Sequence, residues 1–163
     1  MPGDSSATFV FDQDVQTFLA VCRTASLATV DRDGTPHNAN VQFVPHGAGA
    51  AFDLWWVSSP DSAHSQHLLD QPSAAVTVYA HTDAPEQIHG VQMRGVVDAA
   101  LTPQDPGYAA ARERYAARFA FVDTPPFDAA FARQGLYRFR TRWIRWIDNR
   151  RGFGWKSERT LNG

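Results

Sequence analysis

Residues 54 to 72, LWWVSSPDSAHSQHLLDQP, join a predicted strand to a predicted helix. The apolar run 54–57 indicates a buried strand, and the four hydroxyl or turn residues at 58–61 indicate a turn. The helix that follows carries His64 and His67. The first N–H groups of a helix have no internal partners and the dipole is positive there, so hydroxyls and a basic residue at this point can form an anion site.

Two interpretations of this stretch are open from the residues alone. In the first, a phosphate group binds where the strand meets the helix. In the second, Ser62 or Asp61 only caps the helix, since Ser and Asp are favoured N-caps, and the two histidines lie on a solvated face.

Length and composition describe an ordinary globular chain. The 163 residues fit one domain over 1–163, and residues 1–8 are expected to be disordered. A net charge of -2 gives no general attraction to nucleic acid or to an anionic membrane surface. The single cysteine, Cys22, excludes an internal disulfide framework and a cysteine-rich metal site. With no signal-peptide pattern and no apolar run of membrane-spanning length, we expect a cytoplasmic protein with no membrane partner.

The pattern of apolar residues, turns and breaks predicts mainly strands. Helices are predicted over 12–23, from the Ser62 region to about 70, and over 109–121 and 127–133, and strands over 25–30, 36–43, 54–57, 74–79, 88–101 and 136–147. Residues 31–34 carry the Asp-Gly signature of a hairpin, and 45–51 indicate a loop. Six strands with a few inserted helices predict a mainly β, α+β fold, an antiparallel barrel, because closure removes exposed sheet edges.

The second predicted strand is unusually polar. His37, Asn38, Asn40 and Gln42 interrupt its apolar pattern, and asparagine is disfavoured in strands. These side chains either face a polar ligand or lie on an exposed sheet face.

Several chemical signatures are missing from the sequence. It has no G-x-x-x-x-G-K-[ST], G-x-G-x-x-G, H-E-x-x-H or G-x-S-x-G pattern. His64 and His67 lack a nearby carboxylate or cysteine partner, so no metal site is expected. A triad of Ser58, His64 and Asp61 is too close in sequence to place its three groups in line.

The C-terminal segment alternates arginines with aromatic residues: Arg142, Trp143, Arg145, Trp146, Arg150, Arg151, Phe153 and Trp155. Such a pattern can stack on nucleobases, hold a flat heterocycle with a phosphate, or form a dimer interface. The negative net charge argues against nucleic acid.

Four motifs in order resemble the pyridoxamine 5'-phosphate oxidase-like, FMN-binding split-barrel family. They are LATV at 27–30 with Gly34 and Pro36, Ser62-x-His64-x-x-x-Leu68-x-x-x-Pro72 with the strand at 75–78, GVQMRG at 90–95 and DNRRGFG at 148–154. The last two are most similar to a small uncharacterised branch with a C-terminal DNxxGFG motif. The similarity covers about residues 14–156 and implies a six-stranded antiparallel split β-barrel.

The resemblance also implies a cofactor and a partner. FMN would lie at the interface of a homodimer and act on a small-molecule substrate. The cofactor-binding residues implied are Asn40, Val41 and Gln42 at the isoalloxazine edge, Val57 and Ser58 beside the ring and phosphate, Ser62 and His64 at the phosphate, Gln92 from the fifth strand, and Trp146 with Arg151 toward the flavin of the facing subunit.

Three departures from the family pattern change what is expected. Ala63 and His64 replace a basic pair, and Ala39 replaces an arginine. DNRRGFG does not reproduce the C-terminal arginine and histidine groups of a true pyridoxamine 5'-phosphate oxidase. We therefore expect an FMN-dependent oxidoreductase with another substrate, or a non-catalytic protein that binds flavin, deazaflavin or haem.

Overall fold

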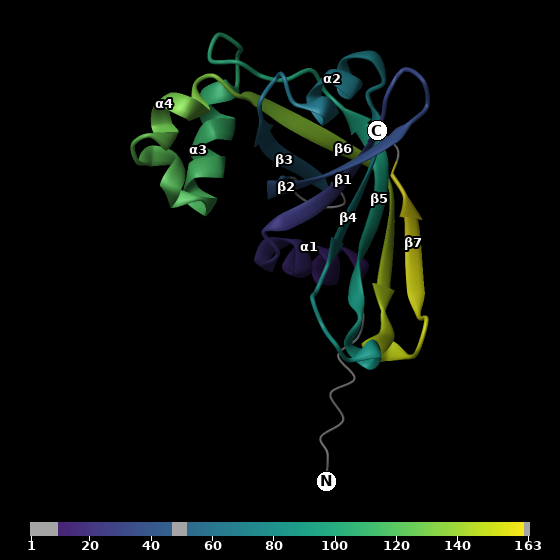
Figure 1. Ribbon diagram of the computed structural model, residues 1–163. Coiled ribbons are helices and arrows are strands. Elements are labelled where there is room, and N and C mark those ends of the chain that lie inside the picture. Colours follow the sequence, from purple (N-terminus) through teal and green to yellow (C-terminus); the bar gives the residue numbers. More distant parts are fainter. Residues whose placement is uncertain (1–9, 47–51, 162–163) are drawn as a thin grey trace.

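One antiparallel sheet of seven strands forms the framework of the described residues, 10–46 and 52–161, of a computed structural model (Figure 1). The strands are β1 Thr24–Val30, β2 Pro36–His46, β3 Asp53–Ser58, β4 Ser73–Tyr79, β5 His89–Val97, β6 Gly135–Asp148 and β7 Lys156–Thr160. The helices are α1 Phe11–Val21, α2 Ala63–Asp70, α3 Tyr108–Arg118 and α4 Phe127–Phe131, with short 3-10 turns η1 Pro85–Gln87, η2 Ala120–Asp123 and η3 Asn149–Arg151. The expectation of disorder for residues 1–8 lies outside the described residues.

Pairing of β3 with β6 closes the first six strands into a barrel. The strand order is β3-β2-β1-β4-β5-β6-β7, and β3 pairs with β6 from Leu54↔Phe139 to Ser58↔Gly135. The predicted six-stranded antiparallel barrel with inserted helices is confirmed. The hairpin between β1 and β2 is also confirmed: Asp31 accepts the N–H groups of Asp33 and Thr35.

The barrel is split between β2 and β3. Their pairing runs from His46↔Asp53 to Phe43↔Trp56 and stops there. Beyond this point residues 36–42 pair only with β1, while Val57 and Ser58 pair only with β6. Helix α2 follows β3 directly and packs against β1 and β2, so it lies beside the opening.

The inner faces of the strands and one face of α1 make the main core. Val15 of α1 is fully buried with Leu27, Phe43, Phe139 and Ile144 from the barrel. Burial of each such side chain contributes about 1.5–3 kcal/mol, so this core is the principal source of stability.

A second, smaller core holds α3, η2 and α4 against the outer face of the barrel. Tyr115, Phe119 and Phe131 pack here with Val44 of β2 and Leu136 of β6. In Figure 1 these helices stand to one side of the barrel, next to the ends of β2 and β3. The predicted helix 109–121 is confirmed, although it ends at Arg118 and continues as η2.

The predicted strand 88–101 is too long. β5 ends at Val97, and a register shift lies between Arg94 and Gly95, where the sequence suggested a bend. A Cβ on Gly95 would lie 2.1 Å from the carbonyl oxygen of Arg140, so only glycine allows the two backbones to approach this closely.

The C-terminal segment contains a strand that the sequence did not predict. DNRRGFG forms the turn between β6 and β7: buried Asp148 accepts hydrogen bonds from Arg150 and Arg151, and Asn149 Oδ1 accepts from Gly154 N at 2.9 Å. Gly152 has a positive φ of 135°. This motif therefore has a clear structural role in turning the chain. No helix in the described ranges has the length and apolar character needed to cross a membrane.

Candidate functional site

Two serines and a histidine meet where β3 leads into α2. His64 Nε2 lies 2.8 Å from Ser58 Oγ and 3.1 Å from Ser62 Oγ. Ser62 is the N-cap of α2 and accepts from the N–H of Ser65 at 3.4 Å, while its hydroxyl lies 2.8 Å from Ser65 Oγ. The structure thus brings together the three residues that the sequence assigned to a phosphate, at the N-terminus of a helix.

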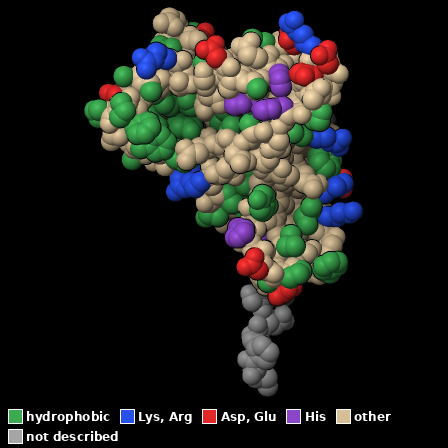
Figure 2. Space-filling model, in the orientation of Figure 1, with side chains coloured by type: hydrophobic (Ala, Val, Ile, Leu, Met, Phe, Trp, Pro, Cys, Tyr) green, Lys and Arg blue, Asp and Glu red, His purple; other side chains and the backbone are tan. Residues whose placement is uncertain are grey.

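Two further histidines adjoin this cluster. The ring of His37, on β2, stacks on that of His64 with centroids 6.5 Å apart, and it meets the ring of His67 edge-on at 5.4 Å. Thr29 Oγ1 lies 3.1 Å from His67 Nδ1 and orients that ring. Figure 2 shows histidine side chains gathered on the surface over α2. The proximity of His37 to α2 could not be predicted from the sequence, because it depends on the pairing of the strands.

Burial and the neighbouring His37 and His67 lower the pKa of His64 below its usual 6.5. The imidazole is therefore mainly neutral at pH 7, and its Nε2 exchanges hydrogen bonds with the hydroxyls of Ser58 and Ser62. The hydrogen bonds and ring contacts of His37, His64 and His67 include no arginine or lysine in the described part of the chain. An anion would have to supply the charge that allows His64 to take up a proton.

A cavity of about 340 Å³ continues from this cluster along the split. Gln42 of β2 and Val57 and Ser58 of β3 line one side, so Ser58 belongs to both the cluster and the cavity. The other side is aromatic and comes from the helices beside the barrel: Tyr115, Phe121, Phe127 and Phe131.

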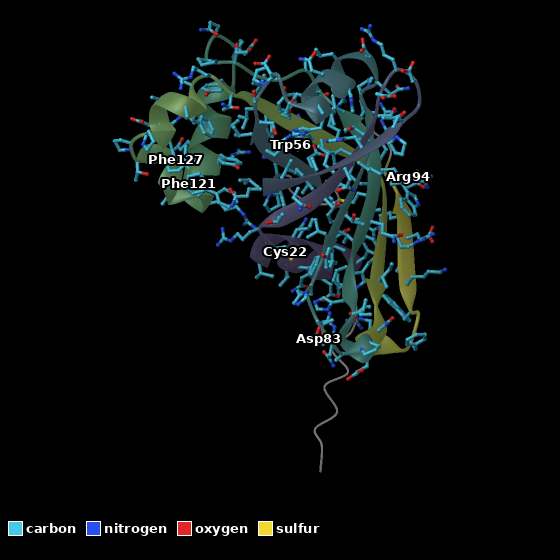
Figure 3. The ribbon with its side chains drawn as sticks, viewed as in Figure 1. Cys22, Trp56, Asp83, Arg94, Phe121 and Phe127 are labelled. Atoms are coloured by element: carbon cyan, nitrogen blue, oxygen red, sulfur yellow. The ribbon has the colours of Figure 1, made fainter. Side chains whose placement is uncertain are left out.

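The aromatic side of this cavity was not predicted. Phe121 and Phe127 are 41% and 51% exposed and lie at its rim, on the helical side of the molecule (Figure 3). The hydroxyl of Tyr115 donates to the backbone carbonyl of Gln42 at 3.2 Å, and burial raises the pKa of this tyrosine to about 12. A signal was present in the sequence, since phenylalanines are unusually frequent from 119 to 131.

The outer face of the sheet carries two more of the predicted residues. Asn40 is exposed on β2, whereas the side chain of Val41 points into the core. Asn40 pairs with Ser26 of β1, Ser26 pairs with Thr77 of β4, and Thr77 pairs with Gln92 of β5. Gln92 Oε1 accepts from Arg145 at 3.3 Å, so a polar row crosses five strands on this face.

Trp146 and Arg151 lie away from the cluster within one chain. The indole of Trp146 is 2% exposed and packs edge-on against Phe18 at 5.1 Å, so within one chain it faces the core. Arg151 is held by Asp148 and Asp14 and lies over Trp155. Figure 1 shows α2 at one end of the barrel and the β6–β7 turn at the other.

The donor set near α2 fits one phosphate group. Two hydroxyls, an imidazole and a helix N-terminus supply donors, and the adjoining cavity has an apolar wall and an amide suited to a flat heterocycle. In the two described ranges no group of three or more His, Cys, Asp or Glu side chains is placed to hold a metal ion.

A six-stranded antiparallel barrel opened between β2 and β3 defines the class of split-barrel proteins. A family model described as pyridoxamine 5'-phosphate oxidase matches residues 11–147, and the chain belongs to this family. A comparison with curated protein sequences gave no match.

Solved structures with the same fold include proteins of different kinds. The conserved hypothetical protein Rv2991 from Mycobacterium tuberculosis is 21% identical with a TM-score of 0.70, covering 95% of this chain and 94% of that one. HutZ, the haem storage protein from Vibrio cholerae, is 16% identical with a TM-score of 0.67 over 82% and 91% of the two chains. A haem-binding protein from Mycobacterium smegmatis is 22% identical with a TM-score of 0.64 over 90% of this chain and 56% of that chain.

Proposed function

We propose that the protein binds FMN and acts as an FMN-dependent oxidoreductase on a small molecule in the cytoplasm. The observation that carries this proposal is the continuity of two features through Ser58: the cluster with Ser62 and His64, and the cavity in the split. A phosphate at the cluster and a planar ring in the cavity would be joined by a short polar chain, which is the outline of FMN.

Different residues of the site bind different parts of the cofactor. Ser58 and Ser62 donate hydroxyl hydrogen bonds to the phosphate, and His64, once protonated, adds a charge-assisted one. Val57 contacts the ring, and Asn40 and Gln42 offer amides to its polar edge. When bound, FMN supplies the hydride chemistry, while the chain orients the ring and limits its contact with water.

A homodimer is part of the proposal. The outer face of the sheet bears the row from Asn40 to Gln92, and it also exposes Tyr79 at 69%. A second copy packed on this face would bring Gln92 toward the cofactor and could place the Arg151 turn of one subunit near the site of the other. Light scattering of the purified protein checks this, and a monomer at high concentration would contradict it.

FMN binding is tested by the visible spectrum of fresh protein and by quenching of FMN fluorescence on titration. We expect bound flavin in the wild type and an affinity at least about tenfold lower in His64→Ala, the loss of one charged hydrogen bond. The matched control is His81→Ala, an exposed histidine on the connection after β4, and it should bind as the wild type does. A colourless protein that ignores added FMN would refute the proposal, and full affinity in His64→Ala would remove the phosphate assignment.

Reduction of the bound flavin distinguishes an oxidoreductase from a non-catalytic flavin carrier. Anaerobic NADH or NADPH should bleach the bound flavin of an oxidoreductase. A flavin that stays oxidised with both reductants, and a deazaflavin that binds in its place, would instead support a non-catalytic binding protein.

Haem binding is the second candidate, and the histidine cluster favours it. His37, His64 and His67 place three imidazoles next to the aromatic-lined cavity, and imidazole is a common axial ligand of haem iron. Two proteins of the same fold are described as haem proteins. A Soret band that disappears in His37→Ala and His64→Ala would support this function over flavin binding.

A further inference from the structure

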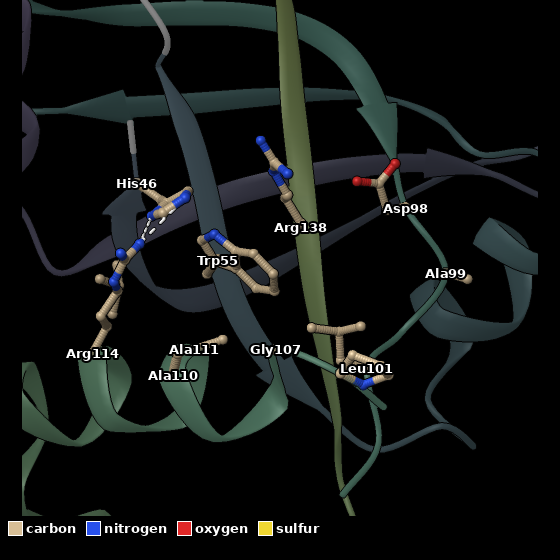
Figure 4. Close-up of a pocket in the computed structure, with 12 residues that line it drawn as sticks. His46, Trp55, Asp98, Ala99, Leu101, Gly107, Ala110, Ala111, Arg114 and Arg138 are labelled. Atoms are coloured by element: carbon tan, nitrogen blue, oxygen red, sulfur yellow. Dashed lines mark hydrogen bonds between the residues drawn. The ribbon is translucent and has the colours of Figure 1, made fainter. Parts of the chain in front are cut away.

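A second cavity, of about 350 Å³, lies between α3 and the outer face of the barrel (Figure 4). The two cavities share no lining residue: Tyr115 lines the first, and Ala110, Ala111 and Arg114 line the second. The second cavity is thus a separate site between α3 and the outer face of β3 and β6.

The shape of this second cavity is set by a tryptophan opposite small residues. Trp55 projects outward from β3, and Gly107, Ala110 and Ala111 form the facing side of α3. Gly107 is the N-cap of α3, and Ala110 and Ala111 lie in the first turn of the helix that follows it. Because they carry little or no side chain, they leave a slot beside the indole whose width suits a flat ring.

The charges around the slot are neutralised in pairs, with one exception. Arg138 is held by the buried carboxylate of Asp53 at 2.6 Å, and Asp98 accepts from Arg140 at 2.8 Å. Arg114 instead donates to Nδ1 of His46, and no carboxylate of the described residues pairs with it.

His46 is neutral at neutral pH and therefore leaves the positive charge of Arg114 in place. Burial, and then the charges of Arg114 and Arg138, lower the pKa of His46, and the carboxylate of Asp53 only partly opposes them. A neutral imidazole accepts the hydrogen bond without cancelling the charge of the guanidinium. The cavity therefore combines an aromatic wall, an apolar helix face and one net positive charge.

We propose that this cavity binds a small aromatic monocarboxylate, with its ring between Trp55 and the small-residue face of α3 and its carboxylate on Arg114. Arginine suits this role because its planar fork matches the geometry of a carboxylate. The assignment does not depend on the flavin proposal, since none of its residues belongs to that site.

The test uses phenylacetate as the probe and phenylacetamide as its uncharged counterpart. Phenylacetate should bind saturably and shift the indole N–H resonance of Trp55, identified with Trp55→Phe, and phenylacetamide should bind at least about tenfold more weakly. Arg114→Gln should weaken phenylacetate by about the same factor. The matched control is Arg112→Gln on the same helix, whose guanidinium pairs with Asp123, and it should leave the affinity unchanged within about twofold.

A second variant fills the slot beside Trp55 and leaves the charge of Arg114 unchanged. Ala110→Leu places a larger side chain at an exposed helical position, which the fold should tolerate, and it should abolish binding of phenylacetate. Equal binding of the acid and the amide, full affinity in Arg114→Gln or Ala110→Leu, or no saturable binding to the wild type would each overturn the proposal. Shifts confined to Gln42, Val57 and Ser58 would also overturn it, because they would place the probe in the other cavity.

Discussion

His64 Nε2 lies 2.8 Å from Ser58 Oγ, and this contact joins the first turn of α2 to the last residue of β3. It places an imidazole at the point where the barrel opens, in surroundings that favour its neutral form. A ligand with negative charge reverses that preference, because the charged imidazole then has a partner.

The coupling between proton and phosphate at His64 predicts a pH dependence of FMN binding. The free protein holds the pKa of His64 below 6.5, and a bound phosphate raises it, so binding takes up a proton between the two values. The ratio of wild-type to His64→Ala affinity for FMN should therefore grow as the pH falls from neutrality. Fluorescence titrations across this range measure the ratio. Riboflavin, which lacks the phosphate, should show no such trend, and a ratio that does not vary with pH would contradict the prediction.

The same imidazole should weaken the ligand-free fold in acid. A histidine with a lowered folded-state pKa takes up its proton more readily in the unfolded chain, so stability falls as the pH drops from 6.5 through the lower folded value. His64→Gln cannot titrate, and its free energy of unfolding should decline less over this interval. Urea denaturation of both proteins at several pH values checks the difference. Parallel curves for the two proteins would show that His64 does not contribute.

The ion pair of Asp53 with Arg138 should matter more to stability than an exposed pair. Asp53 is 7% exposed and also accepts the N–H of Thr141 at 3.2 Å. Asp53→Asn should cost about 2–4 kcal/mol, because it leaves a partly buried guanidinium without its counter-ion. The control is Asp70→Asn, whose pair with Arg32 is solvent-exposed and screened by water, so its loss should cost much less than the loss of the Asp53 pair. Similar losses in the two variants, measured in urea, would contradict the expectation.

Gly95 should be the least replaceable of the glycines in the sheet. Its Cβ would collide with the backbone of β6, so Gly95→Ala should lower the free energy of unfolding by about 2–3 kcal/mol. Gly34→Ala is the comparison: its φ of 84° is costly for alanine, but the space around it is open, so about 1 kcal/mol is expected. Thermal denaturation ranks the two, and an equal or larger loss for Gly34→Ala would contradict the steric argument.

Much of the barrel could be predicted because its signals are local. The Asp-Gly turn at 31–34 and the apolar run at 54–57 each determine a hairpin or strand through a few neighbouring residues. β7 could not be recognised, because Lys156–Thr160 is a polar stretch that becomes a strand only by pairing with β6. An edge strand needs no apolar face, so periodicity does not reveal it.

The site was predictable to the extent that its residues are close in sequence. Ser58, Ser62 and His64 lie within seven positions and meet as expected. His37 and the phenylalanines of the cavity reach the same place through the closure of the barrel and the packing of α4, which no spacing along the chain encodes. Trp146 had the right residue type for a ligand contact, but the alternation of β6 turns it inward.

The pairing of β3 with β6 has a consequence for how the chain reaches its native state. Leu54 and Phe139 are register partners although 85 residues separate them, and α2, β4, β5, α3 and α4 all lie in the intervening segment. Before contacts of such long range can form, a large loop must be closed, and the entropy that this closure costs slows folding. We therefore expect the β1–β2 and β4–β5 hairpins to protect their amides early in refolding, while the seam that closes the barrel, and the ligand site beside it, forms last.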